Sequence, residues 1–289
     1  MLDRRIGPQT QRFAVLGESL SHSWSPYIHN SLFAAAGMDA VYVSITVPEN
    51  RLGAAADVFR SCFSGFNVTI PYKEKIIPYL DEVDDAVRAC GAVNTVEVRD
   101  GRLTGHITDG LGMLRAIEEG GVGTDHAEVM ILGGGGAARV AGYEFLARGG
   151  RVTFAVRDTA KGKRLCEELA ATQADGASRL DVCALPDADR ACDILINCTP
   201  VGMYPHAEGC PASDRALSRC KAVFDAVYNP RETQLLARAR ARGIPCIEGL
   251  GMLFYQAVEA QKIWFGQRIA GARAQSGLYR ELLEQMRCV

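Results

Sequence analysis

The chain has 289 residues, 48% of them hydrophobic, and its 32 lysines and arginines nearly balance 34 aspartates and glutamates, for a formal net charge of -2. That length and apolar content suffice for one large or two modest α/β domains without disulfide or metal staples. The absence of a sustained basic stripe argues against a nucleic-acid partner, and no apolar run approaches the ~18 to 20 residues that span a membrane. Residues 1–12 are charged and polar without a signal-peptide core, so we expect a cytoplasmic protein.

The ten cysteines are scattered, and none forms a C-x-x-C pair. Several lie in apolar, strand-like runs, as Cys198 does after Ile194-Leu195-Ile196-Asn197. We therefore expect buried, reduced thiols in place of disulfides or a zinc site, and we expect no bound metal.

Short strand-like runs alternate with helical patterns in the first third of the chain. Strands are expected at 13–16, 41–45 and 65–70, and a helix at about 83–90. Ser25-Pro26 opens an earlier helix, because the serine is placed to cap it and proline suits the first turn. Asp100-Gly101 separates two strand-like runs, 94–98 and 103–105, and predicts a hairpin.

A second α/β unit is expected to begin near His106. Its strands are expected at 128–132, 151–156, 193–198, 222–226 and 245–247, with helices at 139–148 and 233–242. The run 252–286 has helical apolar stripes and should pack back on the first unit.

The alternation predicts an α/β protein of two domains around a cleft. An N-terminal α/β substrate domain with a mostly parallel sheet would comprise residues 1–105, completed by helices within 252–289. A second, Rossmann-type α/β domain would comprise residues 106–251.

The strongest local motif is Gly133-x-Gly135-x-x-Ala138, directly after a strand and at the start of a helix. The first glycine permits the tight turn, the second lets the backbone approach a pyrophosphate, and the small third residue lets helix pack on strand. Gly136 and Ala137 would add backbone N–H groups at the helix N-terminus, which favours negative charge. The motif therefore predicts a dinucleotide site, the alternative being a purely structural turn.

The end of the next strand distinguishes the two nicotinamide cofactors, because an acid there binds a free ribose 2′-hydroxyl and a base binds a 2′-phosphate. Arg157 and Asp158 are adjacent here, and Lys161 follows closely. The surplus of positive charge favours NADP, with NAD possible.

Six ordered motifs resemble those of the shikimate/quinate dehydrogenase family, and the resemblance runs along essentially the whole chain. They are Ser23-Trp24-Ser25-Pro26, Asn67-Val68-Thr69 continued by Pro71-Tyr72-Lys73, Gly91-Ala92-Val93-Asn94-Thr95, Thr108-Asp109-Gly110, Asp225-Ala226-Val227-Tyr228, and Gly249-Leu250-Gly251-Met252-Leu253 followed by Gln256.

The resemblance implies NADP-dependent interconversion of 3-dehydroshikimate and shikimate, with Lys73 as general acid/base and Asp109 as its partner. The substrate residues that it implies are Ser23, Ser25, Asn67, Thr69, Asn94, Tyr228 and Gln256. The cofactor residues that we expect are Gly133, Gly135, Gly136, Ala137, Arg157, Lys161, Thr199, Gly249 and Met252. The partner would be a small-molecule substrate, and the protein a monomer or homodimer.

Some positions depart from the family pattern or have a simpler explanation. Ile107 stands where the family usually has asparagine, and Val156 and Asp158 replace the residues that flank its phosphate-binding arginine. Asn67 and Asn94 could instead close turns through side-chain bonds to backbone. His22, beside the serines, is a second and less favoured candidate for proton transfer.

Two other functions stay open. One is an NAD-preferring quinate/shikimate dehydrogenase, and the other is a catalytically silent relative that senses a metabolite. Lys73 and Asp109 together argue against the silent relative, because both members of the proton-transfer pair are present.

Overall fold

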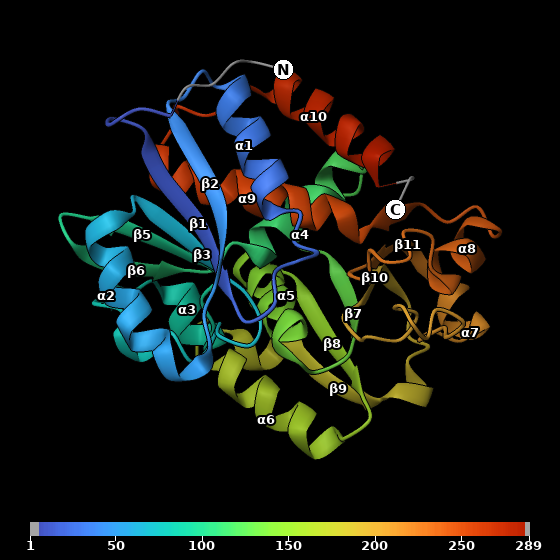
Figure 1. Cartoon of the computed structure of the whole chain (residues 1–289). Coiled ribbons are helices and arrows are strands. Elements are labelled where there is room, and N and C mark those ends of the chain that lie inside the picture. The colour runs from blue at the N-terminus through green and yellow to red at the C-terminus, as the bar shows by residue number, and fades with distance from the viewer. Residues whose placement is uncertain (1–5, 287–289) are drawn as a thin grey trace. The chain divides into compact units, whose positions relative to one another are not determined.

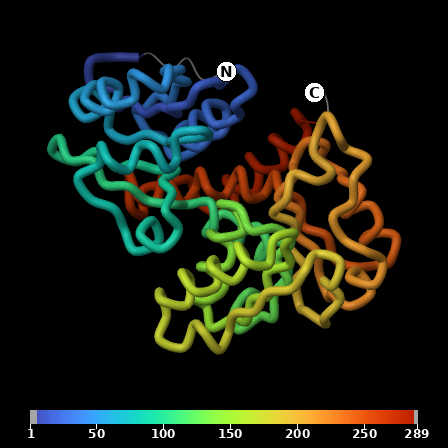
Figure 2. The backbone as a smooth tube through the Cα atoms, turned by 90° about the horizontal axis from the view of Figure 1, so that it is seen from below, coloured from blue at the N-terminus to red at the C-terminus, as the bar shows by residue number. Residues whose placement is uncertain are grey.

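The structure, a computed structural model, describes residues 6–286 and divides into two compact units. Unit 1 holds the described residues up to Thr108 and from Gln256 onward, and unit 2 is Asp109–Tyr255. In Figure 2, unit 1 is the blue to teal part of the chain with the red C-terminal helices, and unit 2 runs from green through yellow to orange. Each unit contains a sheet and helices, which confirms the predicted α/β fold class.

Unit 1 contains a mixed sheet with the strand order β2-β1-β3-β5-β6-β4. Strand β1 runs parallel to β2 and β3, whereas β5 runs antiparallel to β3 and β6. The bounds are β1 Gln11–Gly17, β2 Ala40–Thr46, β3 Gly65–Val68, β4 Glu82–Val83, β5 Thr95–Arg99 and β6 Arg102–His106. The turn between β5 and β6 has positive φ at both Asp100 and Gly101, as a two-residue hairpin turn requires, so the predicted hairpin is confirmed.

The helices of unit 1 are α1 Ser25–Ala35, α2 Leu52–Cys62, α3 Asp85–Cys90, the later part of α9 Gly249–Phe265, and α10 Ala272–Gln285. Helix α1 buries Ile28, Leu32 and Phe33 and lies beside α10 (Figure 1). The prediction that Ser25 caps α1 is wrong. Ser25 is the first helical residue, Trp24 occupies the N-cap position, and no side chain caps the helix.

Trp264 on α9 fastens this helix to the sheet of unit 1. Its indole N–H donates to the carbonyl of Val96 at 3.1 Å, and its ring lies 4.7 Å from the ring of Phe13. A Cβ added at Gly65 would come within 2.5 Å of the indole nitrogen. Glycine at this point of β3 is therefore required by the close approach of the tryptophan.

Unit 2 contains an all-parallel sheet with the strand order β12-β11-β10-β7-β8-β9. The strand bounds are β7 Glu128–Leu132, β8 Arg151–Val156, β9 Leu180–Ala184, β10 Cys192–Asn197, β11 Cys220–Asp225 and β12 Cys246–Glu248. The helix bounds are α4 Asp109–Glu119, α5 Gly136–Ala147, α6 Thr159–Ala170, α7 Asp214–Leu217 and α8 Gln234–Arg240, and α9 begins here. The nearly continuous burial of β7, β10 and β11 is typical of parallel strands covered on both faces.

The nine cysteines within residues 6–286 form no disulfide bond, and Cys288 lies outside the described residues. No helix within residues 6–286 is long and apolar enough to cross a membrane.

His29 is a fully buried imidazole in the core of unit 1. Its ring stacks on Tyr42 at 4.2 Å with an interplanar angle of 4°, and its Nδ1 lies 3.4 Å from Nε2 of Gln261. Burial lowers the pKa of His29 to about 3, because a charged imidazolium would lose its hydration there.

This buried imidazole predicts a loss of stability on mild acidification. The unfolded state binds a proton near the ordinary pKa of histidine, about 6.5, whereas the folded state does not, so the stability present above that pH is lost as pH falls. From about pH 7 to pH 5 the free energy of unfolding should fall by up to about 1.4 kcal/mol per pH unit. Urea unfolding of His29→Phe, which keeps a stacked ring, should show a flatter dependence, and parallel curves for both proteins would contradict the assignment.

Candidate active site

The two predicted serines lie at the start of α1. Ser23 and Ser25 are half-buried on either side of Trp24, and Ser23 Oγ accepts the backbone N–H of Ser25 at 3.4 Å. No hydrogen bond within the described part of the chain engages the Ser25 hydroxyl, so this hydroxyl is able to donate to a bound carboxylate. His22 is exposed.

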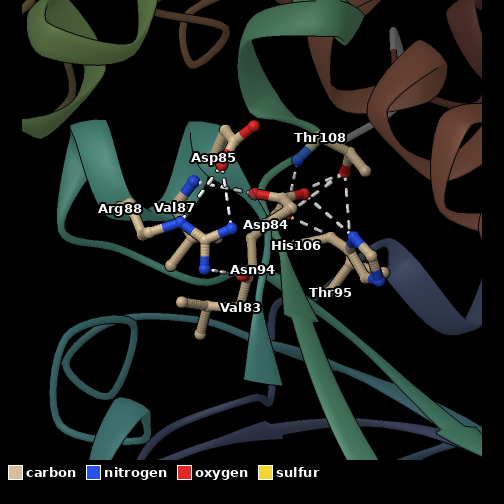
Figure 3. Close-up of polar contacts among 9 residues, drawn as sticks. All are labelled: Val83, Asp84, Asp85, Val87, Arg88, Asn94, Thr95, His106 and Thr108. Carbon is tan, nitrogen blue, oxygen red and sulfur yellow. Dashed lines mark hydrogen bonds and ion pairs between the residues drawn. The ribbon is translucent and has the colours of Figure 1, made fainter. Parts of the chain in front are cut away.

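Asn94 is the centre of a buried polar cluster in unit 1 (Figure 3). Its Oδ1 accepts the backbone N–H of Thr108 at 2.8 Å and the hydroxyl of Thr95 at 3.1 Å. Its Nδ2 lies within donating distance of Thr108 Oγ1 (3.0 Å) and of Gln256 Oε1 (3.3 Å). Asn94 is 3% exposed and Gln256 8% exposed, so the structure brings two predicted substrate residues together in the interior.

Asn67 is also buried, and protein groups use most of its hydrogen-bonding capacity. Its Nδ2 donates to the carbonyl of Asn94 at 3.0 Å and to Thr95 Oγ1 at 2.9 Å, and its Oδ1 accepts the hydroxyl of Tyr42 at 2.6 Å. Both amide hydrogens are thereby occupied, so a ligand could use only the second lone pair of Oδ1. This pattern agrees with the alternative in which Asn67 closes the strand ends. Thr69 follows β3, is half-buried, and donates its backbone N–H to Leu16 at 3.0 Å.

The segment at Val93 and Asn94 holds both chain stretches that carry the predicted proton-transfer pair. The carbonyl of Lys73, a half-buried residue, accepts the backbone N–H of Val93 at 2.8 Å. Thr108, bound by Asn94, directly precedes Asp109, the first residue of α4. A carboxylate in the first turn of a helix is favoured by the helix dipole.

Asp84 and His106 hold the segments around this cluster, and sequence reasoning missed both. Asp84 caps α3 by accepting the N–H of Val87 at 2.8 Å, and its other carboxylate oxygen lies 2.9 Å from His106 Nδ1 (Figure 3). The carbonyl of His106 accepts the N–H of Asn94 at 3.1 Å. Neither residue carried a signal of pairing in the sequence, because His106 ends β6, Asp84 precedes α3, and twenty-two positions separate them.

The glycine turn of unit 2 has the geometry of a phosphate site. Gly133 has φ +111°, a conformation that favours glycine, and a Cβ there would make a tight contact of 3.2 Å with the carbonyl oxygen of Cys198. A Cβ at Gly135 or Gly136 would meet nothing within 4 Å, and no side chain caps α5. The first backbone N–H groups of α5 are therefore open to an approaching diphosphate, which fits a dinucleotide.

Arg157 and Asp158 follow β8 and are both exposed, but only the aspartate is engaged by the protein. Asp158 caps α6 by accepting the N–H groups of Ala160 and Lys161, both at 3.1 Å. No ion pair or hydrogen bond within residues 6–286 engages the Arg157 guanidinium. The cation is thus presented at the strand end, and the carboxylate is directed toward its own helix.

The remaining predicted residues of unit 2 lie at the ends of β10, β11 and β12. Thr199 is half-buried and donates its N–H and its hydroxyl to Asn197 Oδ1 at 2.9 and 2.7 Å. Tyr228 is 41% exposed, and Met252 is half-buried. Glycine is required at position 249 for a structural reason, because a Cβ there would lie 2.6 Å from the carbonyl oxygen of Asp225.

Asn197 and Asp225 were not among the predicted site residues, although both are fully buried. A signal for them was present in the sequence. Each is the polar last residue of a mostly apolar strand, and a buried polar group must find partners.

A buried polar cluster on one α/β unit and a glycine-turn nucleotide site on an all-parallel second unit are typical of two-domain, nicotinamide-dependent dehydrogenases. Comparison with known proteins identifies the family within this class.

The family model described as shikimate dehydrogenase substrate binding domain matches residues 15–96. A shikimate dehydrogenase (NADP(+)) of Symbiobacterium thermophilum is 41% identical over 265 residues, which cover 88% of each chain.

Solved structures agree with this match. The crystal structure of a shikimate dehydrogenase in complex with NADP+ has a TM-score of 0.88 and 33% identity, with coverage of 97% of this chain and 98% of that one. A shikimate 5-dehydrogenase of Listeria monocytogenes in complex with shikimate and NAD has a TM-score of 0.87 and 30% identity, with coverage of 96% and 98%. The chain belongs to the shikimate dehydrogenase family, which confirms the resemblance seen in the sequence.

Loss of the Asn94 amide should destabilise unit 1. Asn94→Ala leaves the buried N–H of Thr108 without its acceptor, and each such orphaned group costs about 1–3 kcal/mol. Denaturant unfolding should show that the free energy of unfolding falls by an amount of that order. The control is Thr104→Ala on β6, whose side chain makes no hydrogen bond in the described part of the chain. Equal stability of the two variants would mean that the cluster does not hold the Thr108 segment.

Proposed function

We propose that the protein catalyses the NADP-dependent, reversible reduction of 3-dehydroshikimate to shikimate, a step toward chorismate and the aromatic amino acids. The observation that carries the proposal is the buried cluster around Asn94, because it ties the Lys73 segment and the Asp109 segment to one point of unit 1. The family membership supports the same reaction.

In this proposal Lys73 is the general acid/base and Asp109 orients it. When bound, the cofactor would supply the hydride that reduces the carbonyl carbon. Lys73 donates a proton to the oxygen that becomes the hydroxyl and removes this proton in the reverse direction. Backbone bonds support the assignment, since the lysine carbonyl is bound next to Asn94 and the aspartate follows a threonine that Asn94 holds.

The polar residues that the sequence motifs carry fit a small hydroxylated acid. Ser23 and Ser25 would bind its carboxylate, since the hydroxyls lie at a helix N-terminus, where anions are favoured. Asn94, Gln256, Tyr228, Thr69 and Asn67 would contact its hydroxyls, Asn67 only through Oδ1.

NADP is favoured over NAD because Arg157 offers an unengaged guanidinium where the 2′-phosphate is expected, and Asp158 is used as a helix cap. The Gly133 turn, Ala137, Lys161, Thr199, Gly249 and Met252 would complete the cofactor site. A second candidate is NAD-linked oxidation of shikimate or quinate. The observation that favours it is the solved structure of the Listeria monocytogenes relative, which is in complex with shikimate and NAD. The domain limits, the cytoplasmic location and a monomeric or dimeric state stay predictions.

Replacement of Lys73 tests the catalytic assignment. Lys73→Ala should fold and bind NADPH yet lose about 10²- to 10⁴-fold in kcat, the usual contribution of a general acid/base. The matched control is Lys75→Ala, because Lys75 is exposed and pairs with Glu49. Absorbance at ~340 nm, the band of the reduced nicotinamide, reports turnover of shikimate and quinate with each cofactor. Near-normal kcat in Lys73→Ala would remove the lysine from the mechanism, and ligand binding without turnover by the unaltered protein would favour a metabolite sensor.

Replacement of Arg157 tests the cofactor assignment. Arg157→Ala should raise the KM for NADP by about tenfold or more, as expected for loss of a charge-assisted phosphate contact, and should leave the KM for NAD nearly unchanged. Arg164→Ala removes an exposed cation further along α6 and serves as the control. If both cofactors are affected alike, the 2′-phosphate does not bind at this arginine.

A further inference from the structure

Four neighbouring strands of unit 2 end in one row. The register pairs Leu132 of β7 with Asn197 of β10, Asn197 with Asp225 of β11, and Asp225 with Glu248 of β12. Asp225 therefore lies in the interior of the row. Its side chain is fully buried, and the catalytic proposal does not use it.

The Asp225 carboxylate accepts hydrogen bonds from three segments. Its Oδ1 accepts Nδ2 of Asn197 at 2.9 Å and the N–H of Val227 at 3.0 Å, and its Oδ2 accepts the hydroxyl of Thr233 at 2.6 Å. Burial raises the pKa of this carboxyl, and the three donors oppose that shift. A buried carboxylate is stable only with such donors, so the segments and the carboxylate hold one another in place.

Asn197 extends this connection to the predicted cofactor side. Its Oδ1 accepts both the N–H and the hydroxyl of Thr199, and the hydroxyl in turn accepts the N–H of Val201 at 3.2 Å. The loop at 198–201 is packed against the glycine turn, because a Cβ at Gly133 would contact both Cys198 and Thr199 at 3.2 Å. Displacement of Asn197 would therefore displace the loop that borders the proposed diphosphate site.

Val227 extends the connection to the predicted substrate side. The residue after it is Tyr228, which is 41% exposed and whose side chain has no hydrogen bond within residues 6–286. The position of Tyr228 thus depends on its backbone, which is fixed at Val227 by the carboxylate and at Ala226 by an N–H bond to the Asn197 carbonyl at 3.0 Å.

We infer that Asp225 is a positioning residue that holds the Thr199 loop and the Tyr228 loop in one fixed arrangement. The inference rests on the proposed function, in which Thr199 contacts the cofactor and Tyr228 the substrate. A change at Asp225 that removes its acceptors weakens both interactions. A change at Asn197 weakens mainly the cofactor interaction, because the Val227 N–H keeps its acceptor.

A set of four variants of the full chain tests the inference. Asp225→Leu has a similar shape but no acceptor, whereas Asp225→Asn keeps one oxygen for Asn197 and Val227 and can donate its amide to the Thr233 hydroxyl. Asn197→Ala removes the contact with Thr199. Thr233→Val is the matched control, because it removes the third donor and the N-cap of α8 but makes no bond to either loop.

The measurements are the KM for NADP and for shikimate, the Kd for NADPH by fluorescence titration, and the midpoint of thermal unfolding. We expect Asp225→Leu to raise both KM values about tenfold or more, since small displacements of positioned groups have effects of that size. Asp225→Asn should restore both to within about threefold. Asn197→Ala should raise the KM for NADP and the Kd for NADPH alone, and Thr233→Val should lower only the unfolding midpoint.

Unchanged constants in folded Asp225→Leu, or constants that change equally in Thr233→Val, would overturn the inference. If Asp225→Leu does not fold, Asn197→Ala decides, because an unaltered Kd for NADPH would overturn the inference and a selective increase would support it. The NADPH titration requires no turnover. An unaltered protein that binds NADPH without oxidising shikimate would refute the proposed function and leave the cofactor part of the inference measurable.

Discussion

The requirement that buried polar groups find partners governs the candidate site. Asn94, Thr95 and Thr108 are at most 3% exposed, and their side chains are joined to one another and to the backbone. Because an orphaned buried group is costly, the cluster has few alternative arrangements. The cluster restricts the positions of the chain segments to which it is hydrogen-bonded, and these segments carry Lys73 and Asp109.

Unit 2 meets the same requirement at the ends of its parallel strands. Asn197 and Asp225 end strands whose other residues are mostly apolar, and each satisfies several donors from the following loops. Parallel strands place their carboxyl ends at one edge of the sheet, where ligands of such folds bind. A polar residue at the end of a strand therefore stabilises the strand end and also positions the ligand-binding loop beside it.

The Arg157 and Asp158 pair illustrates how a helix cap affects cofactor choice. From sequence, a cation and a carboxylate at the end of β8 argue for opposite cofactors. In the structure the carboxylate accepts two backbone N–H groups of α6, and the guanidinium keeps its donors for a ligand. The helix N-terminus needs a hydrogen-bond acceptor, and Asp158 provides it. The two adjacent charges, which have equal weight in the sequence, therefore have different roles in the structure.

Periodicity and turn chemistry were enough to predict much of the fold. The strands at 128–132 and 151–156 have the predicted bounds, and the hairpin at Asp100-Gly101 follows from residues that accept positive φ. Helix α2 was not predicted, although its buried residues, Leu52, Ala56 and Phe59, have helical spacing. Strand β9 was missed although its sequence, LDVCA, is largely apolar, and in the structure it lies at the edge of the sheet with none of its residues fully buried.

By itself, the sequence determined the two α/β units, the glycine turn and the motifs that identify the family, since these depend on residue types at short spacing. Tertiary structure alone decided which polar side chains meet. Gln256 lies 162 residues from Asn94 along the chain, and His106 lies 22 residues from Asp84, yet each pair is in contact. The physical reason is that a hydrogen bond depends on position and direction in space, which become defined only after the sheets and helices have packed.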